Sequence, residues 1–528
     1  MYTADKDLMA RLIHLPLTFI LLLSLLAGLG IGLVFYVTPQ GLGLSDDSIA
    51  YIAGARSLLN GRGYREAWLA SNGPVTHFPP GFSTLLALIG LSGIDPLRGT
   101  RLLNSVLFGV NIFLAGLIGW RMTASKLAGT ALALLFGANA SILRVHSVAM
   151  SEALYIFFGL MSFLALSFFF EIKKNIWLFV SGSLVACAYL SRYAGLSLAA
   201  TFILAFFIMQ RPWRKRVMNS LIFLAGFVPL PLAWSIRNRL LGETATNRIL
   251  VYHPLTSENL KTGIYNFSDF LFPVETWRRI VVQTPYLFES VLGIIGLVLL
   301  GWLIRTAWRS LRPEAEERPE VLSFVNALYV FGYLASILSS MLLFDASMKF
   351  RLRILSHVYV SLLILLVYLG SWAWRRGAFF QRGTVMLFLV LILGLSATDT
   401  FSATSLLRKG GQGYASFQWY DSEAMDYLRS LPEGTRIYTN QPGPVYLYTD
   451  RPCYVLPDLI DPVTALPREG YERGVAALQA DVTSGQAVLA LFKFGSEAED
   501  VQSIYMQLAE ELYLAHDTRG DKIYTAFP

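Results

Sequence analysis

Residues 173–216 read KKNIWLFVSGSLVACAYLSRYAGLSLAATFILAFFIMQRPWRKR, two apolar runs that surround one charge, Arg192, and end in basic residues on both sides. Because short cytoplasmic loops of membrane proteins are rich in Lys and Arg, both ends are expected on the cytoplasmic side, and the chain crosses twice. Each leg of about 16 residues spans roughly 24 Å, less than a hydrocarbon core of about 30 Å. We therefore expect Arg192 at membrane depth, where a charge costs about 2.5–3.5 kcal/mol and marks a functional site.

The composition of the whole chain agrees with this interpretation. The chain has 528 residues, of which 54% are hydrophobic and 15% are charged, whereas soluble proteins carry about 25% charged residues. The fold class expected is therefore a polytopic α-helical membrane protein with about 11 transmembrane helices and a small C-terminal extracytoplasmic α/β domain. The apolar stretches are 15–37, 101–120, 127–143, 152–170, 176–191, 194–209, 217–235, 290–307, 322–344, 354–374 and 384–398.

Several other classes of protein are excluded. The net charge of +7 does not indicate nucleic-acid binding, because the basic residues lie in short loops rather than on a face with aromatic side chains. The two cysteines, Cys187 and Cys453, make no disulfide framework. The sequence has no GxxxxGK[ST] loop, CxxC pair or HExxH motif, which argues against a nucleotide-dependent enzyme.

Loop charges give the expected orientation in the cell inner (plasma) membrane. Lys and Arg are sparse in one set of short connections and concentrated in the other, at 121–126, 173–174, 211–216, 305–318 and 375–382. The richer set is expected to be cytoplasmic, which with eleven crossings places the N-terminus inside and the C-terminus outside. The first apolar stretch is expected to be a retained anchor.

This orientation predicts two domains. Residues 1–398 are expected to form the transmembrane domain, with outer loops at about 38–100 and 236–289. Residues 399–528 are expected to form a soluble extracytoplasmic domain, because helix-like and strand-like stretches alternate in them. The helix-like stretches are 417–431, 471–478 and 501–512, and the strand-like ones are 436–440, 487–492 and 522–527.

Two acids, Asp46 and Asp47, open a helix-like stretch after the first span. Together with Ser45 they are typical cap residues, so helix capping is one interpretation. The other is a general base at the membrane surface, because a carboxylate can take the proton of a hydroxyl or an amine. His77 closes the same loop in the motif HFPPGF, either as an interfacial side chain or as a further site residue.

His146 and Glu152 lie at the start of the fourth span. Glu152 is either a first-turn acid that favours the helix dipole or a site residue. Two potential ligands are too few to define a metal site.

Cations crowd an outer connection before the tenth span, against the positive-inside bias. They either anchor the chain to lipid phosphates or, together with Arg192, grip one specific lipid phosphate, for which the planar guanidinium of arginine is suited. The sequence there reads FDASMKFRLRILSHVY and contains Lys349, Arg351, Arg353 and His357.

Several motifs together resemble the polytopic GT-C glycosyltransferases, in the branch of the protein O-mannosyltransferases, the aminoarabinose transferases and the RgtA-like enzymes. They are the acidic outer loop with Tyr51 four residues after Asp47, then GRGY, HFPPGF, SEALY and LSRYAGL, within a resemblance that covers about residues 10–375. The resemblance implies that a sugar is transferred from a polyprenyl-phosphate carrier outside the membrane, with inversion at the anomeric carbon.

The resemblance also implies roles for individual residues. The catalytic acid matches Asp47 by its spacing to Tyr51, and Asp46 is the alternative, because in many members the first acid of an Asp-Glu pair acts. Glu152 matches a recurrent acid at the start of the fourth span. The basic residue before a late span matches Arg351 or Arg353, although Arg-Leu-Arg and His357 stand where members usually have Arg-Tyr and a proline. Arg192 fits a contact to the carrier phosphate.

We therefore expect an integral-membrane glycosyltransferase of a cell-envelope glycan, with an outer-loop Asp as base. Its partners would be a polyprenyl-phosphate sugar donor, a glycan, lipid or protein acceptor, and membrane lipids, but no nucleic acid. No cofactor is certain, and a divalent metal is left open. The alternatives are a non-enzymatic transporter or flippase of lipid-linked glycans and an assembly scaffold. Transporters place binding residues near the bilayer midplane within repeats, whereas here the charges lie at one face and no repeat is found.

Overall fold

The computed structural model describes residues 16–528, except 243–248, 273, 312–319, 462, 494–495 and 497–498. The basic residues expected at 312–318 therefore lie outside the described residues. The chain folds into two compact units. The first, here the helical unit, comprises the described part of Met1–Thr38 together with Thr76–Phe82 and Arg101–Arg408. The second, here the mixed unit, comprises Pro39–Val75, Ser83–Thr100 and Lys409–Pro528.

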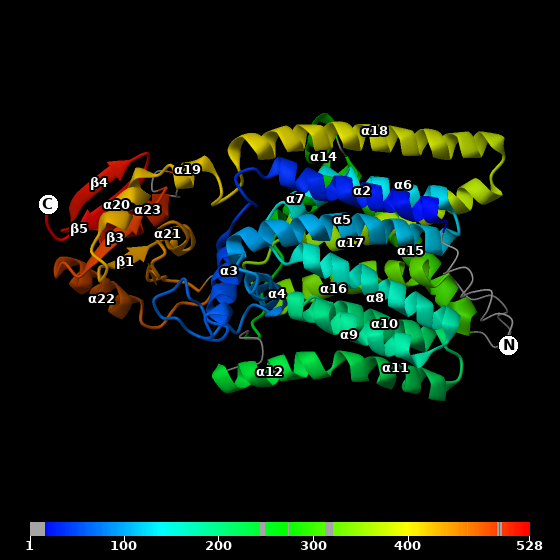
Figure 1. Cartoon of the computed structure of the whole chain (residues 1–528), viewed down its shortest axis with the longest axis horizontal. Helices are drawn as coiled ribbons and strands as arrows, with labels where there is room; N and C mark the ends of the chain where they lie inside the picture. Colours follow the sequence, from blue (N-terminus) through cyan, green and yellow to red (C-terminus); the bar gives the residue numbers. More distant parts are fainter. Residues whose placement is uncertain are drawn as a thin grey trace. The chain divides into compact units, whose positions relative to one another are not determined.

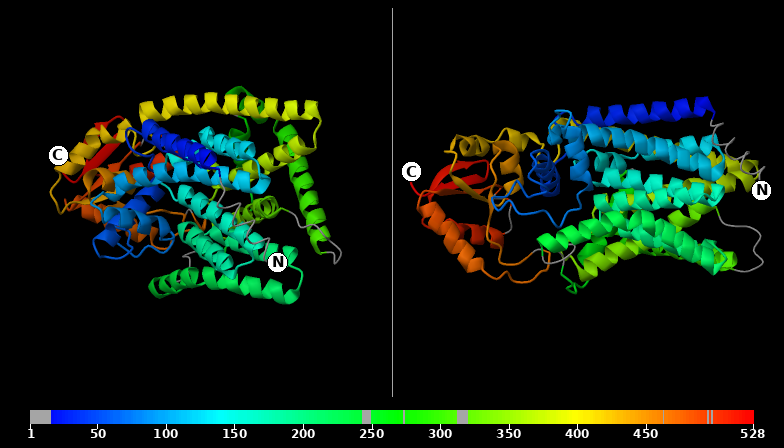
Figure 2. Two further views of the ribbon diagram at one scale, coloured as in Figure 1. Left: turned by 45° about the vertical axis from the view of Figure 1, so that its right-hand side comes forward. Right: turned by 60° about the horizontal axis from the view of Figure 1, so that its bottom comes forward.

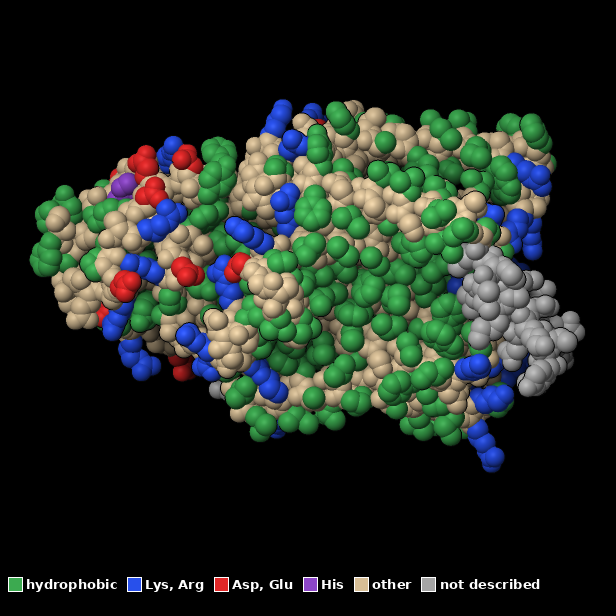
Figure 3. Space-filling view, viewed as in Figure 1, with side chains coloured by type: hydrophobic (Ala, Val, Ile, Leu, Met, Phe, Trp, Pro, Cys, Tyr) green, Lys and Arg blue, Asp and Glu red, His purple; other side chains and the backbone are tan. Residues whose placement is uncertain are grey.

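The helical unit makes the chain a polytopic membrane protein (Figure 1). Among the described residues, seven helices are long and apolar enough to cross a membrane. Hydrophobic side chains cover most of the helical face seen in Figure 3, and Lys and Arg gather near the helix ends. The seven are α2 Leu17–Val37, α5 Pro96–Thr123, α8 Glu152–Ile172, α15 Pro285–Leu311, α16 Val321–Leu343, α17 Leu352–Arg376 and α18 Phe379–Gly410.

The remaining apolar stretches form broken or short helices. Two pairs are bent, α6 Lys126–Gly137 with α7 Ala140–His146 by 64°, and α11 Trp213–Phe227 with α12 Pro229–Leu241 by 51°. Helices α9 Asn175–Ser191 and α10 Gly195–Met209 have 17 and 15 residues. Each of the eleven expected spans therefore lies in a long helix, a bent pair or one of these two short helices. Most ends differ by a few residues, but α18 continues 12 residues beyond the expected end at 398. The connection after α12 contains α13 Ser257–Leu271 and α14 Glu275–Gln283.

Small residues let the short helices pack closely. A Cβ atom on Gly182 of α9 would lie 2.1 Å from the carbonyl oxygen of Phe223 in α11, and one on Gly226 of α11 would lie 2.3 Å from that of Phe179 in α9. Glycine at both contacts allows the two backbones to touch, as is common in membrane helix pairs.

The mixed unit contains a five-stranded sheet in the order β2-β1-β3-β5-β4. β1 Arg436–Thr439 is parallel to β2 Tyr454–Val455 and β3 Ala487–Leu491, whereas β5 Asp521–Thr525 is antiparallel to β3 and to β4 Tyr513–Thr518. The strands expected at 436–440, 487–492 and 522–527 are confirmed. β2 and β4 were not expected, because β2 has only two residues and β4 is largely exposed.

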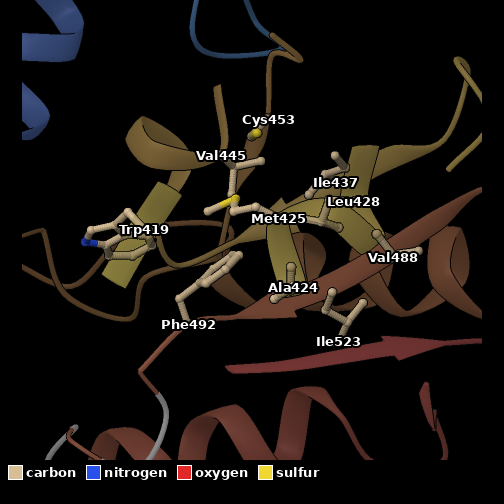
Figure 4. Packing of buried hydrophobic residues seen from close by; sticks show 11 residues of the cluster. Trp419, Ala424, Met425, Leu428, Ile437, Val445, Cys453, Val488, Phe492 and Ile523 are labelled. Carbon is tan, nitrogen blue, oxygen red and sulfur yellow. The ribbon is translucent and has the colours of Figure 1, made fainter. Parts of the chain in front are cut away.

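Helices cover both faces of this sheet (Figures 1 and 2). Side chains alternate between the faces, as the strand period of two requires. Val488 and Ala490 face the core that contains Trp419, Met425 and Phe492 (Figure 4). Leu489 faces a second core that contains side chains of α22 Tyr471–Thr483. The other helices of the unit are α19 Phe417–Tyr420, α20 Glu423–Ser430, α21 Pro442–Thr449 and α23 Glu499–Leu508.

Except for Thr76–Phe82, the first loop belongs to the mixed unit, and its helix α3 Asp46–Leu59 packs with α21. Leu44 forms a parallel bridge with Gly413, and Leu69 forms one with Cys453. α4 Gly81–Gly90 follows the loop. The mixed unit is thus assembled from two parts of the chain that are far apart in sequence, whereas the division expected at residue 398 assigned the loop to the transmembrane domain.

Candidate functional site

The two acids of the first loop begin α3 in the mixed unit. Ser45 is the N-cap residue and forms a capping box with Ser48, whose Oγ accepts a hydrogen bond from the Ser45 backbone N–H at 3.1 Å. The serines therefore cap the helix, and Asp46 and Asp47 lie in its first turn. Neither aspartate is therefore needed as an N-cap, although capping was one of the two interpretations drawn from the sequence.

Asp46 has a defined partner. Its Oδ1 accepts a hydrogen bond of 2.7 Å from the Tyr414 hydroxyl. More than a third of the Asp46 residue is exposed, yet the atoms packed around its carboxylate reduce its solvation. This desolvation raises the pKa of Asp46 above its usual value, the hydrogen bond from Tyr414 lowers it, and the charge of Asp47 raises it further. Asp47 itself is half-buried.

Tyr51 lies one helical turn after Asp47 and is buried in α3. Its backbone carbonyl accepts a hydrogen bond of 3.0 Å from Ser83 Oγ, so the position contributes to how α3 is held in the unit.

The helical unit contains a charged cluster around Glu152, at the first residue of α8. Glu152 has no exposed surface, and its Oε1 lies 2.6 Å from Nη1 of Arg192 and 3.7 Å from Nε of Arg353. The side chains of Arg192 and Arg353 are 19% and 30% exposed, so one side of the cluster is not covered by the protein. One carboxylate between two guanidinium groups leaves a net charge of +1, which can be neutralised by an anion.

The break between α9 and α10 places Arg192 in this cluster. Arg192 ends α9 with extended backbone, and α10 begins again at Gly195. The adjacent Tyr193 donates a hydrogen bond of 3.2 Å to the Thr76 carbonyl, which also accepts one of 3.0 Å from Asn238. A Cβ atom on Gly81 would lie 2.7 Å from the Leu190 carbonyl oxygen. The HFPPGF and LSRYAGL motifs are therefore in contact within the helical unit.

The other basic candidates take different places. Arg351 is the exposed N-cap residue of α17, and Lys349 lies 3.9 Å from Glu258 at the surface. Arg353 is the one that reaches Glu152. Of the cations expected to grip one phosphate together, the structure thus brings Arg192 and Arg353 to one carboxylate and leaves Arg351 outside that contact.

His357 does not lie on the outer connection, as the sequence suggested, but inside α17. It is buried between the rings of Tyr155 and Tyr333, at centroid distances of 4.4 and 5.3 Å, and lines a small pocket. Its Nδ1 lies 2.9 Å from Ser356 Oγ. The sequence suggested an outer position because polar residues continue into the first turns of α17.

His146 is also a core residue. It is fully buried in α7, with Nε2 3.1 Å from Asn111 Nδ2 and Nδ1 2.9 Å from the Ile142 carbonyl oxygen. Both ring nitrogens thus have partners in the protein.

His77 is half-buried, and its ring lies 4.3 Å from that of Phe78. Across the part of the chain that the structure describes, no three His, Cys, Asp or Glu side chains are grouped to hold a metal ion.

Sequence patterns missed two features. One is Tyr414, which the GQGY sequence at 411–414 does not distinguish from an ordinary linker residue. The other is an ion-pair network in the helical unit, in which Asp269 of α13 is paired with Arg144 of α7 at 3.2 Å and with Arg278 of α14. Arg278 also lies 3.7 Å from Asp399 of α18. These partners come from four separate helices, so no local spacing could reveal them.

No protein-family model matches the chain, and no curated protein sequence matches it. Solved structures do. The Archaeoglobus fulgidus oligosaccharyltransferase in complex with Zn and sulfate matches with a TM-score of 0.55 and 12% identity, over 95% of this chain and 73% of that one. The ArnT structure from Cupriavidus metallidurans bound to undecaprenyl phosphate matches with a TM-score of 0.52 and 12% identity, over 95% and 97%.

The chain has the GT-C fold. A further structure of this fold, AglB from Archaeoglobus fulgidus in complex with an inhibitory peptide and a dolichol-phosphate, matches with a TM-score of 0.54 and 12% identity, over 97% of this chain and 74% of that one. At this identity the likeness establishes the GT-C fold, and the activity has to be argued from the residues.

Proposed function

We propose that the chain is an integral-membrane GT-C glycosyltransferase that transfers a sugar from a polyprenyl-phosphate donor to an acceptor outside the cell inner membrane. The observation that carries this proposal is the net positive cluster of Glu152, Arg192 and Arg353 in a membrane-spanning unit. Such a cluster suits a phosphate that carries a lipid tail. ArnT and AglB, which share the fold, have been solved with undecaprenyl phosphate and with dolichol-phosphate.

In this mechanism Arg192 and Arg353 bind the donor phosphate, and a carboxylate of the Asp46–Asp47 pair accepts the proton of the acceptor. A bond forms between the acceptor heteroatom and the anomeric carbon as the bond from that carbon to the phosphate oxygen breaks, with inversion. The bonding electrons leave with the lipid phosphate, whose added negative charge the guanidinium groups stabilise. Because the phosphate leaves in ionised form, no general acid is required.

The proposal is tested by mass spectrometry of lipid extracts and surface glycans from cells that lack the protein. The cells are complemented with wild type, with Asp46→Asn, with Asp47→Asn or with Arg192→Ala. We expect one polyprenyl-phosphate sugar to accumulate and one surface modification to disappear, with rescue by wild type. Arg192→Ala and at least one of the two Asp variants should fail to rescue.

The matched controls are Asp426→Asn and Arg279→Ala. Each removes an exposed charged side chain that forms an ion pair with a residue of the same helix. Both should rescue fully. Unchanged lipids in the deleted cells, or rescue by all variants, would contradict the proposal and leave a transporter or scaffold role.

A further inference from the structure

The contact between Asp46 and Tyr414 links the first loop to the segment that follows the last spanning helix. The two residues are 368 positions apart in the sequence, and the phenol oxygen lies 2.7 Å from Asp46 Oδ1. Hydrogen bonds between a neutral donor and an ionised carboxylate are shorter and stronger than those between neutral groups. The contact therefore orients the carboxylate most firmly when Asp46 is ionised.

The backbone around Tyr414 is held beside the backbone that precedes Asp46. The Leu44 N–H donates to the Gln412 carbonyl at 3.2 Å, and the Tyr414 N–H donates to the Leu44 carbonyl at 3.0 Å. Gly413 has a φ of +59°, and a Cβ atom there would lie 2.0 Å from the Leu44 carbonyl oxygen, so only glycine permits this bridge. The bridge therefore fixes the position of the Tyr414 backbone along the segment that leads into α3.

The ring of Tyr414 is held from the sheet side. It packs edge-on against Trp419, with ring centroids 5.3 Å apart, and Trp419 belongs to the core shown in Figure 4. The Tyr448 hydroxyl donates to the Tyr414 carbonyl at 2.5 Å. The orientation of the phenol is thus determined by the folded core of the mixed unit and not by the loop alone.

Helix α21 closes the other side of the carboxylate. Oε1 of Gln441, the residue before α21, lies 3.1 Å from the Tyr414 hydroxyl and is an alternative acceptor for its single proton, which the closer and charged carboxylate of Asp46 binds more strongly. A Cβ atom on Gly443 would lie 3.1 Å from Asp46 Oδ1, so a side chain at position 443 would press on the carboxylate from the first turn of α21.

We infer that Tyr414 is a positioning residue that orients Asp46, so that Asp46 is the acid of the pair that takes the acceptor proton. This inference rests on the proposed function. The phenol holds Oδ1, and Oδ2 receives the proton. A base that is oriented by a third group is the arrangement expected for proton transfer. Tyr414 keeps its own proton throughout, because burial and the nearby charge of Asp46 raise the pKa of the phenol.

Within the described residues, the titratable groups that act on Asp46 are Asp47 on the same helix and Tyr414 on the linker. From α21, Gln441 and Gly443 bring no charge. The hydrogen bond of Tyr414 is to Asp46, so loss of the phenol acts first on the Asp46 carboxyl.

The test uses the full chain in nanodiscs, with the polyprenyl-phosphate sugar fraction as donor and the unmodified acceptor fraction as acceptor, both extracted from cells that lack the protein. Consumption of this lipid is followed by mass spectrometry between pH 5 and 9 for wild type and Tyr414→Phe. We expect kcat to fall about tenfold, KM for the lipid to stay unchanged, and the acidic limb of the kcat profile to move to higher pH. The limb moves because the hydrogen bond that lowers the pKa of Asp46 is lost.

The matched control is Tyr438→Phe, which removes another tyrosine–aspartate hydrogen bond of 2.7 Å in the same unit, to Asp481. It should leave the profile unchanged. If Tyr414→Phe reduces the amount of folded protein, Gly443→Ala displaces the same carboxylate from the α21 side and should give the same lower kcat. A wild-type kcat and pH profile in Tyr414→Phe would overturn the inference alone. A wild type that consumes no lipid would overturn the proposed function, and the inference with it.

Discussion

Glu152 is a fully buried carboxylate that affects both the stability of the protein and the binding of an anion, and the two effects can be measured separately. Its negative charge lies between Arg192 and Arg353, so both arginines are partly neutralised without a ligand. Removing one member of a buried ionic cluster leaves the others uncompensated. The carboxylate therefore holds the arginines in place and also competes with any anion that they bind.

We predict that Glu152→Gln lowers the stability of the protein by about 3 kcal/mol. Undecaprenyl phosphate should raise its Tm more than that of wild type, because the lipid phosphate supplies the missing negative charge and binds only the folded state. Thermal unfolding in detergent, with and without the lipid, measures both effects. Glu171→Gln, which removes the exposed partner of Arg121, is the control. An equal lipid-induced shift in Glu152→Gln and wild type would contradict the assignment.

Asp46 gives a second prediction at the residue scale, from its raised pKa. A carboxyl with a higher pKa in the folded than in the unfolded protein stabilises the fold below its unfolded pKa of about 3.9, and this contribution is lost as pH rises through the folded pKa. Asp46→Asn cannot ionise. The Tm of Asp46→Asn minus that of wild type should therefore be more positive at pH 7 than at pH 4. A difference that does not change with pH would show that the Asp46 pKa is not raised.

At the scale of elements, the break between α9 and α10 supports the basic cluster. The segment Thr76–Phe82 lies against this break, where Gly81 contacts the backbone at Leu190. Gly81→Ala should cost about 1–3 kcal/mol, because the added methyl group meets a carbonyl oxygen at 2.7 Å and the backbone has to shift. Donor consumption should fall as well, because the shifted backbone carries Arg192.

The control for Gly81→Ala is Gly32→Ala in α2, where a Cβ atom has nothing within 4 Å. This variant should not lower the free energy of unfolding, because Ala favours the helix over Gly by about 0.5–1 kcal/mol and meets no clash there. Equal stability of the two variants in thermal unfolding would show that the segment Thr76–Phe82 is not tightly packed against α9.

These elements also show what the sequence could predict. The apolar stretches located the spanning helices, and the single charge in 176–209 located the break at Arg192, because hydropathy and charge are local signals. Arg192 and Glu152 were both candidates from the sequence, but their pairing was not. Tyr414 was missed because its role depends on a contact across 368 positions, which no local pattern encodes.

At the scale of the whole molecule, the mixed unit is built from the first loop and the C-terminal segment. Besides the bridge at Leu44, the Cys453 N–H donates to the Trp68 carbonyl at 3.1 Å, and the Ala70 N–H donates to the Cys453 carbonyl at 2.8 Å. These contacts can form only when both segments of the chain are present. The loop that carries Asp46 therefore reaches its final structure only after residues 409–528 have been made.

The same architecture predicts what happens when the chain is cut between the last spanning helix and the sheet. If a protease site is inserted between Gly410 and Gly411, where α18 ends, and cleaved, the fragment 411–528 should stay bound on gel filtration, because the first loop remains paired with it. Gly413→Ala in the cleaved protein should weaken this association without abolishing it, because its methyl group would collide with the Leu44 carbonyl while the backbone hydrogen bonds between Cys453 and residues Trp68 and Ala70 remain. A fragment that separates from the cleaved wild type would mean that the C-terminal segment is an independent domain, and that Tyr414 cannot hold Asp46.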